Sequence, residues 1–196
     1  MEHPFPPGSL VLGAKGTFFA RSLDSELKLS SEIMLAAAKH DGCSVMEMLT
    51  NCVIFNDGAH KLITDREYRA DRTIVLRHGE KMIFGKDKDK GLALDYSQSL
   101  IPQLVVVAAD DERVLTHDAT LQDPTLHRML AMMGQNGDMS LPVALGVIRN
   151  IEEESYDIAV NQQIIRLRIQ LFYGTSHCKQ CRIQNIDLFY FFNSSE

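Results

Sequence analysis

Residues 17–49 contain the pattern that most restricts the fold, because they read as strand, helix and strand. TFFARS (Thr17–Ser22) is a strand candidate, and SSEIMLAAAKH has a helical period from about Leu29, which Ser30 or Ser31 can cap and Gly42 can end. The next segment, CSVMEML, is a second buried strand candidate. Such a βαβ crossover makes the two strands parallel neighbours. The predicted helical face consists of Ile33, Ala36, Ala37 and His40.

The composition is that of an ordinary globular protein. Of 196 residues, 45% are hydrophobic and 23% are charged, which suffices for one domain with a sizeable core, or one with a small appendage. The formal net charge of −6 gives no field that attracts phosphate backbones or anionic lipid, so no nucleic acid and no membrane partner is expected. The N-terminus lacks a signal-peptide pattern, and no run of about twenty apolar residues occurs. We therefore expect a cytoplasmic protein.

A polar motif, NCVIFND (Asn51–Asp57), follows the second predicted strand. It places amide, thiol and carboxylate side chains directly after an apolar segment. In open parallel sheets, ligands bind beyond the carboxyl ends of the strands. The position of the motif therefore predicts a binding site at this edge of the sheet.

The middle of the chain predicts a hairpin, a loop and two further strands. TIVLRHGEKMIFG has strand residues on both sides of His78-Gly79-Glu80, which is typical of a hairpin. KDKDKG (Lys86–Gly91) alternates in charge and is interpreted as a solvated loop. QLVVVAA and LPVALGVIRN are apolar strand candidates.

One more helix is predicted after Asp123 and Pro124, with Gly134 as its end. Methionine-rich stripes at helical spacing usually belong to a hydrophobic core, and we interpret this one in that way. The stripe consists of Leu126, Met129, Leu130 and Met133.

The tail, residues 164–196, differs from what precedes it. LFYFFNSSE has neither the alternation of a strand nor a helical stripe, and an aromatic cluster of this kind needs a surface to cover it. We interpret the tail as lying outside the ancestral fold. Its aromatic residues are Phe172, Tyr173, Phe189, Tyr190, Phe191 and Phe192.

The four cysteines are expected to be thiols, because disulfides are rare in the cytosol. Cys178 and Cys181 form a C-x-x-C pair beside His177, which offers half of a zinc site. A closed zinc site needs four ligands, and the sequence holds no second C-x-x-C or H-x-x-H. We interpret the pair as incidental, with a small metal-binding module as the alternative.

Two further motifs are weak. His117-Asp118 has the residues to orient an imidazole for acid–base chemistry, although such a lone pair is most often structural. Gly137-Asp138 with Asn161 is similar to the magnesium-diphosphate motif of thiamine enzymes, but it precedes an apolar strand instead of following one. Spacing alone identifies no complete active site.

Several segments together resemble one family. LVLGAKGTFFARS, AAAKHDGCSVMEMLTNCVIFNDG, TIVLRHGEKMIFG, HDAT…TLHRMLAMM and LPVALGVIRNIEEESYD occur in order between about His3 and Gln163. They resemble the β subunit of the 2-oxoacid:ferredoxin oxidoreductases, most closely the 2-oxoglutarate type, and the NC-x-IFND block is the most specific part. The chain looks like the C-terminal half of that subunit.

The resemblance implies an enzyme that oxidatively decarboxylates a 2-oxoacid to acyl-CoA and passes electrons to ferredoxin. Its implied cofactors are thiamine diphosphate, Mg2+ and a 4Fe-4S cluster, and its implied partners are an alpha subunit, ferredoxin, the 2-oxoacid and coenzyme A. The cysteines that hold most of the cluster and the Gly-Asp-Gly segment of the family are not in this sequence. The isolated chain is therefore expected to be inactive without an N-terminal half and the alpha subunit.

The resemblance assigns roles to three residues of the motif. It implies that Cys52 is an iron–sulfur ligand and that Asn51 and Asn56 contribute to cofactor binding. The alternative for Cys52 is a small buried apolar residue, the usual situation of a free cysteine. Cys43 has no counterpart in the family and is interpreted as a packing residue.

The predicted fold class is α/β: part of a doubly wound parallel sheet of the thiamine-diphosphate-binding type, with a small C-terminal α+β extension. The predicted boundaries divide the chain into residues 1–60, 61–163 and 164–196. Alternatives to an oxidoreductase fragment are a non-catalytic remnant and a small partner- or metal-binding module. A sheet that lacks its first half exposes an edge strand and apolar helix faces, so we expect the isolated chain to associate.

Overall fold

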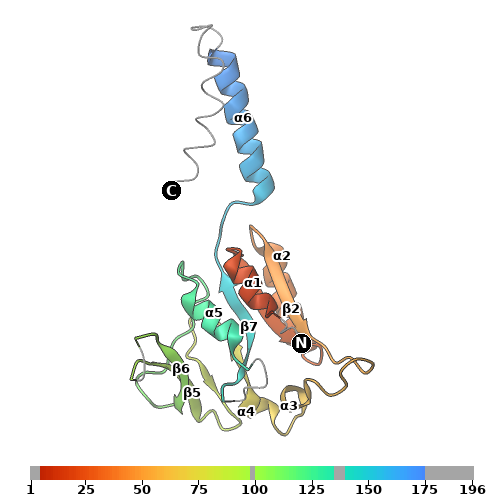
Figure 1. Cartoon of the computed structure of the whole chain (residues 1–196), viewed down its shortest axis with the longest axis vertical. Helices are drawn as coiled ribbons and strands as arrows, with labels where there is room; N and C mark the ends of the chain where they lie inside the picture. The colour runs from red at the N-terminus through yellow and green to blue at the C-terminus, as the bar shows by residue number, and fades with distance from the viewer. Residues whose placement is uncertain (1–4, 98–99, 135–139, 175–196) are drawn as a thin grey trace. The chain divides into compact units, whose positions relative to one another are not determined.

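The computed structural model describes residues 5–97, 100–134 and 140–174 (Figure 1). The chain forms two compact units, residues 1–153 and 154–196, which are described separately. The elements, in chain order, are α1 (Pro7–Gly13), β1 (Phe18–Leu23), α2 (Leu27–Lys39), β2 (Ser44–Leu49), α3 (Lys61–Thr64), α4 (Arg69–Arg72), β3 (Thr73–Leu76), β4 (Ile83–Phe84), β5 (Lys90–Asp95), β6 (Gln103–Ala108), α5 (Thr125–Met132), β7 (Val143–Asn150) and α6 (Tyr156–Gly174).

The predicted βαβ crossover is confirmed. β1 and β2 are parallel neighbours, in register from Phe18 opposite Ser44 to Leu23 opposite Leu49, and α2 connects them. β1 is buried along its whole length, as an inner strand should be. The prediction that the second strand is buried was wrong, because β2 lies at the edge of the sheet and is only half covered.

The predicted caps of this helix were wrong as well. α2 begins at Leu27, so Ser30 and Ser31 lie inside its first turns. The Ser30 hydroxyl donates to the carbonyl of Leu23 at 3.3 Å, and the Ser31 hydroxyl donates to the carbonyl of Leu27 at 2.9 Å. The helix ends at Lys39, and Gly42 adopts a φ of +127° in the turn that leads into β2.

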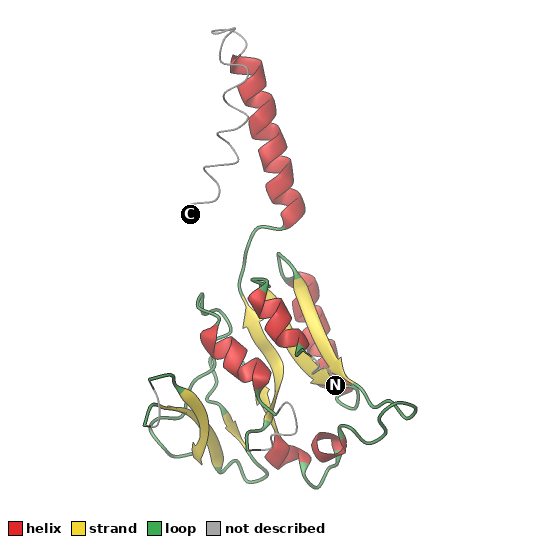
Figure 2. Cartoon of the chain, viewed as in Figure 1, coloured by secondary structure: helices red, strands yellow, loops and turns green. Residues whose placement is uncertain are grey.

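The main sheet has the strand order β2-β1-β7-β3. β7 runs antiparallel to β1 and parallel to β3, so the sheet is mixed. The sheet contains strands from before and after residue 60. The predicted domain boundaries after residues 60 and 163 stay predictions. With helices packed on both of its faces, the α/β fold class is confirmed (Figure 2).

The two faces of the sheet are covered by different helices. Ile33 of α2 packs with Phe18 on one face, and Leu130 of α5 packs with Phe19 on the other, together with α1. Adjacent residues of a strand point to opposite faces, so the Phe18-Phe19 pair supplies both cores. α1 and α5 thereby bring the beginning and the late part of the unit together.

The predicted hairpin around His78-Gly79-Glu80 was wrong. β3 pairs with β7 in the main sheet, whereas β4 pairs with β5 in a separate antiparallel sheet of order β4-β5-β6. The connecting residues bond to another segment: Gly79 N donates to His117 O at 2.8 Å, and Met82 N donates to Leu115 O at 2.8 Å. The turn itself is present, because Glu80 N donates to Arg77 O at 3.1 Å, but the strands on its two sides pair with other partners.

The remaining elements largely follow the sequence. Residues 86–89 of the charged loop are exposed, and Lys90 begins β5. QLVVVAA forms β6 and LPVALGVIRN forms β7, the latter almost entirely buried. The helix predicted after Asp123 is α5, where Asp123 Oδ1 accepts from Thr125 N at 2.7 Å. Its buried residues are His127, Leu130 and Ala131, and Met133 directly after it is buried too.

The second unit contains α6, whose side chains are mostly exposed as far as residue 170. Within the described ranges, no helix has the length and apolar character to cross a bilayer. Several predicted features lie outside the described residues, namely Gly137-Asp138, His177, Cys178, Cys181 and the aromatic cluster at residues 189–192.

Candidate functional site

The NCVIFND motif follows β2 at the carboxyl edge of the sheet, as the sequence predicted. It leaves β2 after Leu49, at the edge where the carboxyl ends of β1 and β2 meet. Asp24, which directly follows β1, accepts a hydrogen bond from Asn51 N at 3.4 Å. The two strand ends of the crossover therefore fix the start of the loop.

The Asn51 side chain closes the loop on itself. Asn51 Nδ2 donates to Asp57 Oδ1 at 2.9 Å, and Asn51 Oδ1 accepts from Gly58 N at 2.9 Å. Gly58 has a φ of +76°, a left-handed conformation that glycine adopts without strain. The segment from Asn51 to Gly58 is thus a closed loop, named here the NC loop.

Cys52 lies inside the NC loop beside a cluster of backbone amides. Asn56 N donates to the carbonyl of Cys52 at 3.0 Å, and the two residues form an isolated antiparallel bridge. The backbone amides of Phe55 and Ile54, and more weakly that of Asn56, hydrogen-bond to the thiolate and hold the pKa of Cys52 below its usual value. Amide donors around a thiolate sulfur are also what tunes iron–sulfur sites.

The Cys52 thiol is exposed, and so are the side chains at the tip of the NC loop. Val53, Ile54 and Phe55 are 72%, 82% and 89% exposed. Three adjacent apolar side chains in water form a patch that favours contact with another surface. The alternative that Cys52 is a buried packing residue was therefore wrong.

The other predicted residues are distributed as follows. Asn56 is the residue that pairs with Cys52 in the isolated bridge. The roles of Asn51 and Asn56 in cofactor binding stay predictions. Cys43 is exposed, so its interpretation as a packing residue was wrong. Its backbone, not its side chain, makes the contacts, since Cys43 N donates to Thr17 Oγ1 and Cys43 O accepts from Phe18 N.

His117 and Asp118 do not form an acid–base pair. The His117 ring is buried and its Nε2 lies 2.8 Å from Val147 O, whereas the Asp118 carboxylate accepts from Thr120. His127 Nε2 lies 2.9 Å from the backbone carbonyl of Asp118. Burial lowers the pKa of both histidines, so both are neutral structural groups.

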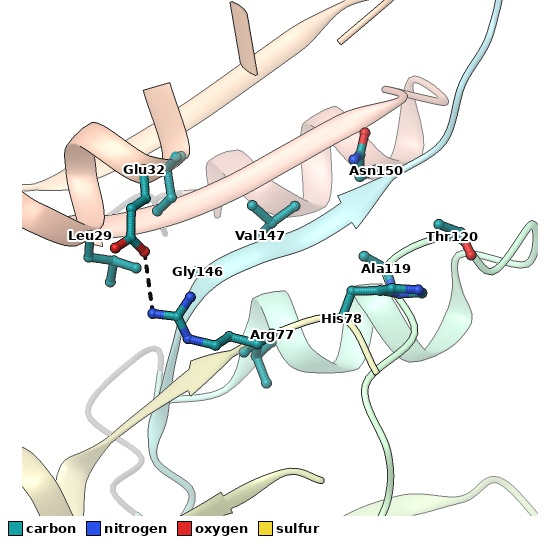
Figure 3. A pocket seen from close by; sticks show the side chains of 11 residues that line it. Leu29, Glu32, Arg77, His78, Ala119, Thr120, Gly146, Val147 and Asn150 are labelled. Atoms are coloured by element: carbon teal, nitrogen blue, oxygen red, sulfur yellow. Dashed lines mark hydrogen bonds and ion pairs between the residues drawn. The ribbon is translucent and has the colours of Figure 1, made fainter. Parts of the chain in front are cut away.

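A pocket that sequence reasoning missed lies over β7. It has a volume of about 340 Å³, and its lining includes Ile33 of α2, Leu76 of β3 and Val147 of β7 (Figure 3). Arg77 reaches across to Glu32, at 3.3 Å, as the dashed line in Figure 3 marks. No sequence signal pointed to this pocket, because its wall is assembled from segments that are far apart in the chain.

The residues of this chain fit a four-iron cluster in part, and they do not fit thiamine diphosphate with Mg2+. A four-iron cluster needs several thiolates, and Cys52 offers one, with amide donors suited to a bound sulfur. In the described part of the chain, no three or more His, Cys, Asp or Glu side chains form a group that could hold a metal. The sequence also has no Gly-Asp-Gly segment for magnesium diphosphate, so no step through thiamine diphosphate follows from these residues.

The sequence of this chain is similar to that of a known oxidoreductase subunit. The chain is 34% identical over 177 residues to the 2-oxoglutarate oxidoreductase subunit KorB of Mycobacterium tuberculosis. This confirms the resemblance to the 2-oxoacid:ferredoxin oxidoreductase β subunits. The match covers 90% of this chain and 46% of KorB, so the chain spans about half the length of that relative. No family model matches the chain, and no solved structure matches it significantly.

Proposed function

We propose that this chain is a fragment of the β subunit of a 2-oxoacid:ferredoxin oxidoreductase, and that the complete enzyme acts on 2-oxoglutarate. The observation that carries the proposal is the position of Cys52 in the NC loop, directly after β2 at the edge where the carboxyl ends of β1 and β2 meet. The similarity to KorB over most of the chain supports the same assignment.

In this proposal Cys52 supplies one thiolate ligand to a 4Fe-4S cluster, and the other ligands come from outside the described residues. When bound, the cluster supplies one-electron transfer toward ferredoxin. The amides of Phe55 and Ile54 lower the pKa of Cys52, which favours the thiolate form that binds iron. Val53, Ile54 and Phe55 exclude water on the exposed side of that thiolate once a partner surface covers them.

The remaining parts of the activity require other polypeptides. An N-terminal half would bring the residues for thiamine diphosphate and Mg2+, and an alpha subunit would complete the site for the 2-oxoacid and coenzyme A. The chain alone is inactive in this proposal. A reducing, cytoplasmic compartment suits a thiolate ligand.

The test is anaerobic purification of the tagged chain, expressed from its own locus, with assays for iron and thiamine diphosphate in the eluate. Two further polypeptides and about four irons per complex are expected. Cys52→Ser should lose most of this iron, and Cys43→Ser, a change at a second exposed cysteine of the described residues, should retain it. A metal-free chain without partners would contradict the proposal and favour the non-catalytic remnant.

A further inference from the structure

The pocket over β7 has an apolar wall with polar side chains at both ends (Figure 3). Its apolar side chains come from α2, β3 and β7, and Val147 stands between the two ends in this view. Arg77 and Glu32 form one end, and His78 and Asn150 belong to the other. A mostly apolar cavity with a few polar groups is the usual form of a small-molecule site.

His78 offers a hydrogen-bond donor to this pocket. Its Nδ1 accepts from Ala119 N at 3.2 Å, so the neutral ring carries its proton on Nε2. Asp118 Oδ1 lies 3.4 Å from the same Nδ1, and a doubly protonated ring would also have a proton on Nε2. Nε2 is therefore a donor in both states, and no described residue is bonded to it. The Asp118 carboxylate beside the ring disfavours an anion at this end.

Asn150 is held so that it also presents a donor. Its Oδ1 lies 2.9 Å from His40 Nδ1, and because an amide oxygen only accepts, the imidazole donates this bond. His40 Nε2 lies 2.8 Å from Thr17 Oγ1, which fixes the ring from its other side. The amide oxygen of Asn150 is thus occupied, and its Nδ2, which has no partner among the described residues, keeps both hydrogens for a ligand.

Arg77 supplies the positive charge at the opposite end. Its guanidinium lies 3.3 Å from the Glu32 carboxylate, and the two side chains are 52% and 41% exposed. An ion pair this exposed contributes little, so another carboxylate can replace Glu32 at small cost. Guanidinium groups also match the planar geometry of a carboxylate. Among the described residues of the lining, Glu32 is the one carboxylate, and the three donors outnumber it.

We propose that this pocket binds a medium-chain organic acid with an uncharged acceptor oxygen at its far end. The carboxylate replaces Glu32 on Arg77, and the apolar chain lies along Val147 toward the donors of His78 and Asn150. At about 30 Å³ for each water-sized group, the pocket of about 340 Å³ holds roughly ten non-hydrogen atoms. Such a ligand differs from a 2-oxoacid, whose oxo group lies next to a carboxylate.

The test compares three ligands of nearly equal length on the full chain, by saturation-transfer NMR titration. 6-Oxoheptanoate has both polar ends, 6-oxoheptanamide lacks the charge, and heptanoate lacks the acceptor oxygen. 6-Oxoheptanoate should bind with a Kd of about 1 mM or tighter, which is within reach of a ligand of this size. The other two should bind at least about threefold more weakly.

Two variants at the charged end should change the affinity for 6-oxoheptanoate in opposite directions. Arg77→Gln should weaken binding roughly five- to tenfold, because it removes a charge-assisted hydrogen bond. Glu32→Gln should strengthen binding about two- to threefold, because it removes the competing carboxylate. Both residues are about half exposed, so neither change should impair folding. Arg113→Gln, at an exposed arginine outside the lining, is the charge control and should leave the affinity unchanged.

Equal affinity for the acid and the amide would overturn the inference and identify a groove for uncharged apolar molecules or for another polypeptide. No binding of 6-oxoheptanoate up to about 10 mM, or a loss of affinity in Glu32→Gln, would overturn it too. The titration is independent of the proposed function, because the lining shares no residue with the NC loop and no iron is needed. A chain that never acquires iron can therefore still confirm the site.

Discussion

Arg21 of β1 and Glu47 of β2 form an ion pair in the sheet, with Arg21 Nε 2.6 Å from Glu47 Oε2. The two residues face each other in the parallel register, and their side chains are only 2% and 14% exposed. Arg21 Nη2 also donates to the carbonyl of Ala131 in α5 at 2.8 Å. A single guanidinium therefore links the crossover to a helix that follows about a hundred residues later in the chain.

Glu47→Ala should destabilise the chain strongly, since it leaves the Arg21 charge buried without its carboxylate partner. We expect a loss of about 2–4 kcal/mol in the free energy of unfolding, measured by urea titration at low protein concentration. Glu32→Ala, which breaks the exposed pair with Arg77, is the matched control and should cost less than about 1 kcal/mol. Equal losses in the two variants would contradict the interpretation.

Asp111 should titrate unusually low. The Arg113 guanidinium, which donates to Asp111 Oδ2 at 2.7 Å, and the Arg113 amide lower the pKa of this carboxyl to about 2. A lowered folded pKa means that the contribution to stability is present above the ordinary pKa and is lost as the pH falls toward 2. Carboxyl NMR titration should show this midpoint, and Arg113→Gln should return it toward the usual value of about 3.9.

The buried pair His117 and His127 should make the chain sensitive to acid. Burial lowers the pKa of both imidazoles, so the unfolded state binds protons more readily. Their contribution to stability is full above about pH 6.5 and is lost as the pH falls through their lowered pKa values. Urea midpoints should therefore fall between about pH 7.5 and about pH 5.5.

His127→Gln should reduce this dependence on pH, because it removes one of the two buried titrating rings. Gln103→Asn, a change at an exposed residue that does not titrate, is the control and should leave the dependence intact. A wild-type midpoint that is constant over this interval would show that the buried rings are protonated without cost.

The local sequence was sufficient for the βαβ crossover. The β-branched and aromatic residues of β1 and the helical period of α2 predicted it, and the site position followed from it. Phe18 and Phe19 pack in different cores, because adjacent residues of a strand point to opposite faces. The family resemblance added the role of Cys52, which no local pattern indicates.

The features that the local sequence did not predict depend on hydrogen bonds between residues that are distant in the chain. The segment around Gly79 does turn, with Glu80 N bonded to Arg77 O, yet its other backbone bonds go to residues 115–117, so the strands on its two sides do not pair with each other. Neither the insertion of β7 between β1 and β3 nor the pairing of Arg21 with Glu47 follows from local propensity. The closure of the NC loop by Asn51 likewise depends on contacts six and seven residues away.

The apolar tip of the NC loop should drive the isolated chain to associate. Phe55 is 89% exposed, and Leu27 and Leu35 of α2 are also exposed, at 76% and 62%. Among the described strands, β2 stands at the edge of its sheet. Sedimentation velocity should show an average mass that rises with concentration, and Phe55→Ser should lower it. Tyr68→Ser, which removes a less exposed aromatic ring outside the tip, is the control. A sharp wild-type monomer with a cooperative melt would mean that the tip needs no partner, which would also weaken the case that another polypeptide covers Cys52.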